Sequence, residues 1–290
     1  MMYYFGTILS LSAILMTAAL GNAFLMKSGQ INLGGEGQIY AGGFIAAIIF
    51  NSRIPFFLSL PLGLLMAGTM GTVLTVLSVI LQKYKRINYM LSSFLISAAV
   101  IPITDALIAG PFRGKNANLL STDFIDKSIR FKSILPPSTF NGYFFFAVLL
   151  CLAGAFVVYR TTTGYQLSIY GKAQQFSIYM GFSDTKFPFI TGSLCGFLHG
   201  LAGAAAVLGN YYACHTGFYS GLGWNSLSSC MIAFSNPLLI IPSSICVSAV
   251  TTGAGYFAFF HNFDFDISGL IQGIVFFMIA VFSTKMRIKQ

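Results

Sequence analysis

Charged side chains are scarce in this chain of 290 residues and missing from long parts of it. Only 8% of the residues are Asp, Glu, Lys or Arg, compared with about 25% in soluble domains, and none of the four types occurs between Phe187 and Phe263. A water-soluble protein could not cover its surface with so few charges. The long continuous apolar runs also differ from the short alternating segments of a transmembrane barrel. The composition therefore predicts an all-α, polytopic membrane protein.

The motifs of enzymes and of metal sites are also missing. The five cysteines show no CxxC spacing, and the three histidines are isolated from one another, which disfavours zinc and redox sites. The string nearest to a phosphate-binding P-loop is GPFRGKN at 110–116, but its spacing is wrong and Asn116 replaces the required hydroxyl. We therefore predict no catalytic residue, no metal site and no cofactor in this chain.

The charge that is present gathers at the ends of apolar segments. Basic clusters occur at residues 83–86 and 285–289, and the net charge is +9. Lys and Arg are enriched in the cytoplasmic loops of membrane proteins. The basic balance therefore indicates orientation in a membrane, with lipid as the surrounding partner and no nucleic acid.

Length and hydropathy predict roughly nine spans in a single transmembrane domain, residues 1–290. One of them, near residues 28–52, is short for a full crossing, so we expect a broken or re-entrant element packed inside the protein. The first apolar run has the features of a retained span rather than of a signal peptide. The predicted spans are 4–26, 38–52, 55–82, 87–109, 139–159, 187–208, 222–236, 237–260 and 267–284.

The basic loops predict an orientation. If residues 83–86, residues 160–186 and the C-terminal tail face the cytoplasm, the order of the spans places the N-terminus outside. The loop 110–138 then also lies outside, although it carries basic side chains as well as Asp123 and Asp126.

Residues 27–44, KSGQINLGGEGQIYAGGF, combine six glycines with Asn32, Glu36 and Gln38. Glycine permits non-helical backbone, and a carboxylate inside a membrane is usually paired or functional. This segment is either part of a translocation pathway or a hinge of its gate, or it is a structural turn in which Glu36 caps a helix or pairs with Lys27. Both interpretations remain open at this point.

Small residues recur every four positions at Gly192, Gly196 and Gly200, a spacing that lets two helix backbones approach closely. We favour packing within the chain over a subunit interface. The segment 159–186 contains a second pattern, in which apolar residues around Phe176 and Tyr179 predict a short amphipathic helix. That helix could contact a partner protein or lie on the bilayer surface.

Five segments, taken in order, carry a resemblance to a known family. Residues 31–43 (INLGGEGQIYAGG) are similar to its N-I-G-x-E-G-Q segment, and residues 160–182 to its R-T-x-x-G-x-x-L-R-A-x-G segment. The other three are INYMLSSFLISA (87–98), GSLCGFLHGLAGAAAVLG (192–209) and GLGWNSLSSCMIAFSNP (221–237). The chain thus resembles the permease subunits of bacterial ABC importers of the ribose and branched-chain amino acid type, most closely those of nucleoside importers.

The resemblance implies a multi-pass permease in a bacterial cytoplasmic (inner) membrane. Its partners would be a second homologous permease subunit, cytoplasmic ABC ATPases that bind ATP and Mg, and an extracytoplasmic substrate-binding protein or lipoprotein. The implied substrate is a nucleoside-like or ribose- or ribityl-containing small molecule, such as a nucleoside, riboflavin or a simple sugar. A stand-alone secondary transporter or channel is the alternative.

The resemblance also implies roles for particular residues. The family's coupling helix, which docks on the ATPase, would lie in the 160–186 loop, where Ala173-Gln174 replaces the family's Asn-Pro. The expected coupling residues are Gly171, Phe176, Tyr179 and Gly181. The expected pathway residues are Asn32, Glu36, Gln38, Trp224, Asn225 and Ser228.

Overall fold

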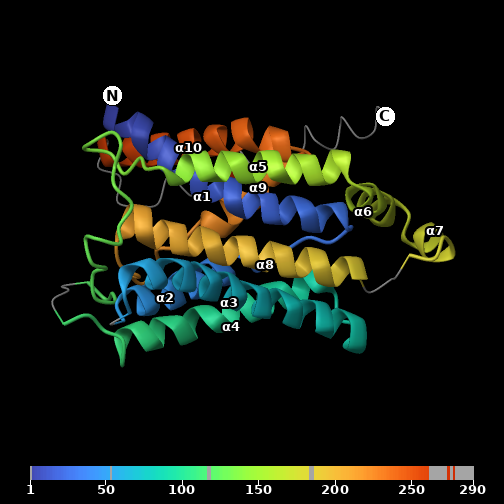
Figure 1. Cartoon of the computed structure of the whole chain (residues 1–290), viewed down its shortest axis with the longest axis horizontal. Helices are drawn as coiled ribbons and strands as arrows, with labels where there is room; N and C mark the ends of the chain where they lie inside the picture. The colour runs from blue at the N-terminus through green and yellow to red at the C-terminus, as the bar shows by residue number, and fades with distance from the viewer. Residues whose placement is uncertain are drawn as a thin grey trace.

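The computed structural model describes residues 2–52, 54–115, 119–182 and 186–260, together with Gly273, Ile274 and Phe277. Within these ranges the regular secondary structure is helical, and β-structure is limited to two isolated bridges in the connecting segments. The longer helices run roughly parallel to one another (Figure 1). They are α1 (Met2–Lys27), α2 (Gly35–Phe50), α3 (Phe56–Lys85), α4 (Tyr89–Ala109), α5 (Tyr143–Arg160), α6 (Thr162–Lys172), α7 (Gln174–Tyr179), α8 (Lys186–Ala206), the π-helical η1 (Val207–Tyr211), α9 (Leu222–Ile232) and α10 (Pro237–Phe260).

Six of these helices are long and apolar enough to cross a bilayer: α1, α3, α4, α5, α8 with η1, and α10. The helix α2, with 16 residues, reaches only about 24 Å at 1.5 Å per residue, less than the roughly 30 Å of the hydrocarbon core. The helix α9 has 11 residues. The predicted all-α class and the short second element are confirmed. The count of nine is not confirmed, and the predicted span 267–284 lies outside the described residues, apart from three isolated positions.

Two helices form the centre of the bundle. In the spanning stretch of α1, 83% of the residues are buried, and in that of α8 72%, whereas α4 and α5 each bury 28%. Large apolar side chains such as Leu149 and Phe156 point outward from α5, with 62% and 64% of their surface exposed. In a membrane protein such outward-facing apolar surface contacts lipid.

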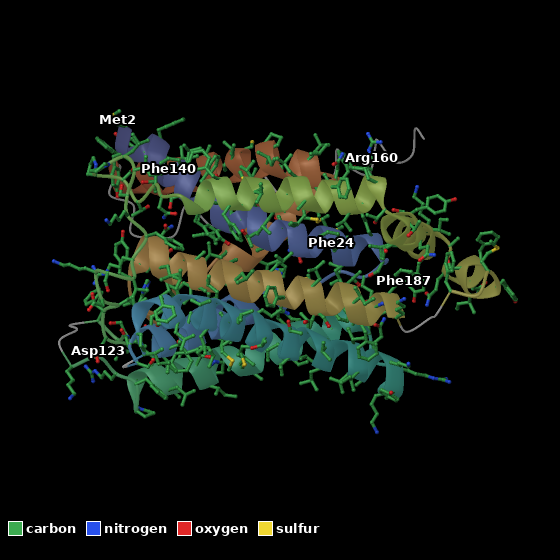
Figure 2. The ribbon with its side chains drawn as sticks, viewed as in Figure 1. Met2, Phe24, Asp123, Phe140, Arg160 and Phe187 are labelled. Atoms are coloured by element: carbon green, nitrogen blue, oxygen red, sulfur yellow. The ribbon has the colours of Figure 1, made fainter. Side chains whose placement is uncertain are left out.

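The connections divide between the two ends of the bundle. Met2, Asp123 and Phe140 lie at one end, and Arg160 and Phe187 lie at the other (Figure 2). Residues near the end of α3 and residues of α6 line one cavity, so both lie at the same end of the bundle. The loops 83–86 and 160–186 therefore share an end, opposite the N-terminus and the 110–142 loop, as the parity of the spans predicts. The C-terminal tail lies outside the described residues.

Candidate functional site

The helix α2 begins in the interior of the bundle rather than at its surface. Residues 28–34 are not helical, and α2 starts at Gly35. The Gly37 N–H donates to Ser97 Oγ at 2.8 Å, and Ser97 lies near the middle of α4. A non-helical segment therefore enters from the α6–α7 end and becomes a helix about half-way across.

Side chains satisfy the backbone of this break. The Leu33 N–H donates to Ser93 Oγ at 3.2 Å, and the Gly34 N–H donates to Asn32 Oδ1 at 2.9 Å. Irregular backbone at membrane depth is tolerated only where the protein itself supplies such partners. The serines of α4 and the amide of Asn32 thus replace the bonds that a continuous helix would have made.

The side chains of Asn32 and Gln38 hydrogen-bond to each other and fix the non-helical segment to the start of α2. Each is only 2% exposed. Asn32 Nδ2 donates to Gln38 Oε1 at 2.8 Å, and Gln38 Nε2 donates to Asn32 Oδ1 at 3.2 Å. Asn32 Nδ2 also lies 3.5 Å from Cys195 Sγ of α8. In this conformation the two side-chain amides are therefore hydrogen-bond partners of each other, and both are too buried to contact a translocated molecule.

Glu36 is half-buried, and its carboxylate reaches the connection before α9. The Gly221 N–H donates to Glu36 Oε1 at 2.9 Å. Gly221 is the N-cap of α9, and Glu36 lies in the first turn of α2. The carboxylate therefore lies beside two helix N-termini, whose partial positive charge favours an anion. Its hydrogen-bond partner is this backbone amide, and Lys27 is not its partner.

The second group of predicted pathway residues lies on α9, next to Glu36. A Cβ added to Gly223 would fall 2.4 Å from the Glu36 nitrogen, so α9 and α2 touch through their backbones. Trp224 is 42% exposed, and Ser228 is partly exposed, with its hydroxyl donating to Trp224 O at 2.9 Å. Asn225 is 5% exposed, and its Oδ1 is buried without a hydrogen-bond partner. The structure thus brings Glu36 and α9 together from distant parts of the sequence.

A second carboxylate, that of Asp105, is joined to α2 by a hydrogen bond that no pattern in the sequence indicates. Tyr40 of α2 donates a short hydrogen bond to Asp105 of α4, and the Tyr219 ring lies 4.5 Å from the Tyr40 ring, centre to centre. In the sequence, the only sign of this arrangement is the presence of Asp105 in an apolar span.

His199 is fully buried between α1, α2 and α8. Its Nδ1 hydrogen-bonds to Cys195 O at 2.8 Å, while its Nε2 is buried without a partner. A Cβ on Gly35 would lie 3.0 Å from that Nε2. The histidine therefore packs against the start of α2. Across the described ranges, no group of three or more His, Cys, Asp or Glu side chains is arranged to hold a metal ion.

The glycine stripe of α8 packs on α3. A Cβ on Gly196 would lie 2.2 Å from Gly71 O, and one on Gly200 would lie 2.0 Å from Ala67 O. Gly192 faces the Val79 side chain. The two backbones are in van der Waals contact, which is the close approach that small residues permit.

The segment between α5 and α8 forms two short helices, α6 and α7, and α7 projects beyond the ends of the long helices (Figure 1). Phe176 is 55% exposed and Tyr179 is 91% exposed. Gly181 follows with φ 83°, a conformation that glycine adopts without strain. Gly171 of α6 instead faces the bundle, where a Cβ would lie 1.9 Å from Lys27 O. The predicted coupling residues thus divide into one inner contact and an exposed aromatic surface.

Comparison with known proteins identifies the family. Residues 4–280 match the family described as the permease component of branched-chain amino acid transport systems. The chain is 31% identical to the probable riboflavin import permease protein RfuC of Treponema pallidum (strain Nichols), over 90% of this chain and 70% of that protein. It is 22% identical to the guanosine ABC transporter permease protein NupP of Bacillus subtilis (strain 168), over 96% of this chain and 81% of that protein.

A third relative is the nucleoside ABC transporter permease protein NupB of Lactococcus lactis subsp. cremoris (strain MG1363), 22% identical over 83% of this chain and 69% of that protein. The matches span the helix break, the two carboxylates and the α6–α7 segment. Together with six membrane-spanning helices, they show that this chain is a multi-pass inner-membrane protein that belongs to the permease family of ABC transporters.

Proposed function

We propose that this chain is the transmembrane subunit of an ABC importer and forms part of the pathway for a riboflavin- or nucleoside-like molecule. A simple sugar is the third candidate substrate. The observation that carries the proposal is the helix break at residues 28–34, which places the Glu36 carboxylate at mid-depth in a chain of the permease family. Discontinuous helices of this kind form substrate sites in other transporters.

The names of the relatives support this substrate class. They are named for riboflavin, guanosine and nucleosides, all of which combine a flat heteroaromatic ring with hydroxyl groups. The exposed Trp224 and the neighbouring Ser228 offer the matching chemistry, because an aromatic face stacks on a flat ring and a hydroxyl both donates and accepts hydrogen bonds.

A second permease subunit would cover the face that carries Glu36 and Asp105. Both carboxylates are partly exposed in the single chain. An acidic side chain facing lipid costs about 2.5–3.5 kcal/mol at the bilayer centre. This cost favours a partner subunit and a water-filled pathway on that face. We therefore place the substrate route between two homologous permease subunits.

The energy would come from separate ATPase subunits that bind ATP and Mg at the α6–α7 end. This end carries basic side chains, among them Lys83, Lys85, Arg160 and Lys172, as expected for the cytoplasmic side. The exposed aromatics of α7 then supply the docking surface, since exposed apolar patches with polar surroundings mark interaction sites. A substrate-binding protein or lipoprotein would deliver the substrate at the 110–142 end.

Reconstitution tests this proposal. Vesicles holding the permease pair, the ATPase and the binding protein should accumulate riboflavin or guanosine only when ATP is hydrolysed. Uptake that continues when vanadate blocks hydrolysis would indicate a secondary transporter instead. Phe176→Asp and Tyr179→Asp should each abolish uptake while the subunit still inserts. Phe176→Leu and Tyr179→Phe, which keep an apolar side chain at these two exposed positions, are the matched controls and should leave uptake unchanged.

A further inference from the structure

Two cavities lie side by side at the α6–α7 end. The first, of about 360 Å³, lies between residues 28–30, the last turns of α3, α6 and the start of α8. The second, of about 250 Å³, lies between residues 29–31, Gln82 near the end of α3 and the start of α4. Gly29, Gln30 and Gln82 line both cavities. The second alone is smaller than the roughly 300–1,000 Å³ of ordinary small-molecule pockets.

One amide pair separates the two cavities. Gln30 Nε2 donates to Gln82 Oε1 at 2.6 Å, which ties the 28–34 segment to the end of α3. The other amide atom of Gln30, Oε1, is buried and accepts no hydrogen bond. Leaving a buried acceptor unpaired is unfavourable, so the closed pair carries a cost that disappears when water or a polar molecule reaches it.

The 28–34 segment is in direct contact with α6. Gly29 has φ 82°, and its nitrogen would lie 3.2 Å from a Cβ built on Gly171. The same Cβ would lie 1.9 Å from Lys27 O. Two pieces of backbone in such contact, with no side chain between them, cannot approach each other further. A displacement of α6 toward the bundle must therefore push the turn at Gly29.

The same segment continues into the helix break. Seven residues after Gly29 the chain reaches Glu36. Asn32 lies between them and forms its amide pair with Gln38, two residues beyond Glu36. The segment thus connects α6 at one end with the mid-depth carboxylate at the other, and Gln30 lies within it.

We infer that Gln30 and Gln82 form an inner gate, which opens when α6 moves and displaces the 28–34 segment away from α3. Separation of the two amides joins the cavities into one polar space that opens toward the cytoplasm. This inference rests on the proposed function, because it assumes that α6 and α7 move with an ATPase. It adds a residue pair, remote from the α9 side chains, that controls release of the substrate.

Cross-linking in the complete importer tests the gate. Gln30→Cys and Gln82→Cys are combined in a Cys246→Ser background, which removes the one exposed cysteine of the described residues, and joined by a short bifunctional thiol reagent with a reducible linker. ATP-driven uptake by the double-cysteine variant should fall at least tenfold on cross-linking and return on reduction, while the reagent should leave uptake by each single-cysteine variant at its own untreated level. Uptake within twofold of the reduced form in fully cross-linked protein would overturn the gate.

Alanine variants give a second readout that does not need cross-linking. Gln30→Ala and Gln82→Ala should each raise the number of ATP molecules hydrolysed per substrate molecule at least threefold, because the gate no longer closes. Thr251→Ala, which removes a 3.0 Å hydroxyl hydrogen bond within α10, is the control and should leave this ratio unchanged. An unchanged ratio in both glutamine variants counts against the gate alone, whereas absence of ATP-driven uptake in the unmodified importer counts against the proposed function.

Discussion

Gly196→Ala is the sharpest test of the α3–α8 contact. The added methyl group would lie 2.2 Å from Gly71 O and 2.2 Å from Thr75 Oγ1, so α3 and α8 must separate to admit it. Overpacking of this kind costs about 1–3 kcal/mol, and we expect the upper end because one of the atoms met is backbone. Alanine is favoured over glycine in a helix by about 1 kcal/mol, which offsets part of this cost, so the free energy of unfolding should fall by about 2 kcal/mol in total.

Gly255→Ala is the matched control, since a Cβ at Gly255 of α10 meets no atom within 4 Å. This variant should keep the gain of about 1 kcal/mol. At roughly 2–4 °C per kcal/mol for a chain of this size, Gly196→Ala should unfold about 4–8 °C below the unmodified protein and Gly255→Ala slightly above it.

Thermal unfolding in detergent measures this difference with a thiol-reactive fluorophore. Four of the five cysteines are buried and react only when the bundle opens. An unfolding temperature of Gly196→Ala equal to or above that of the unmodified protein would refute the close packing of α3 on α8.

Two further predictions concern charged side chains. Glu36→Gln keeps the side-chain oxygen that accepts the Gly221 N–H but removes the charge. The variant should insert normally, and its uptake should be about tenfold lower, which corresponds to about 1.4 kcal/mol. Uptake equal to that of the unmodified importer would exclude a role for the charge. Outside the spans, the Ser128 N–H and hydroxyl donate to Asp126 and lower its pKa. The ordering that this gives to the loop is complete above about pH 4 and is lost as the pH falls through the lowered pKa. At pH 7 Asp126→Asn should therefore speed hydrogen exchange of the 125–131 backbone. A difference between the two proteins that stays equally large once the pH has fallen below the lowered pKa of Asp126 would contradict this reasoning.

Much of the fold can be predicted from the sequence, because the apolar composition of each span indicates that it lies in the membrane. The scarcity of charge and the apolar runs indicate the membrane class, and the glycines around Glu36 indicate a break in the second element. The spacing of Gly192, Gly196 and Gly200 likewise indicates one closely packed helix face. These features are local in the sequence, so hydropathy and spacing reveal them.

The candidate site could be predicted only in part, because its contacts join distant segments. Glu36 accepts a hydrogen bond from Gly221, 185 residues further along the chain, and no local sequence pattern indicates that contact. Hydropathy also does not distinguish a helix that crosses the membrane from one that stops half-way. The sequence therefore predicts a full span at 222–236, where the structure has only the 11-residue helix α9. The contact between Gly29 and Gly171 depends on how α6 folds back on the bundle, and single-sequence reasoning gives no access to it.

The helix break also imposes an order on the biogenesis of the protein. The Leu33 and Gly37 amides find their acceptors on Ser93 and Ser97, each 60 residues downstream. While the ribosome is still synthesising α3, those acceptors do not exist, and an unpaired amide in hydrocarbon costs several kcal/mol. Residues 28–37 therefore have to stay in a hydrated environment at the translocon until α4 has been synthesised. Only then can the start of α2 form its hydrogen bonds to Ser93 and Ser97.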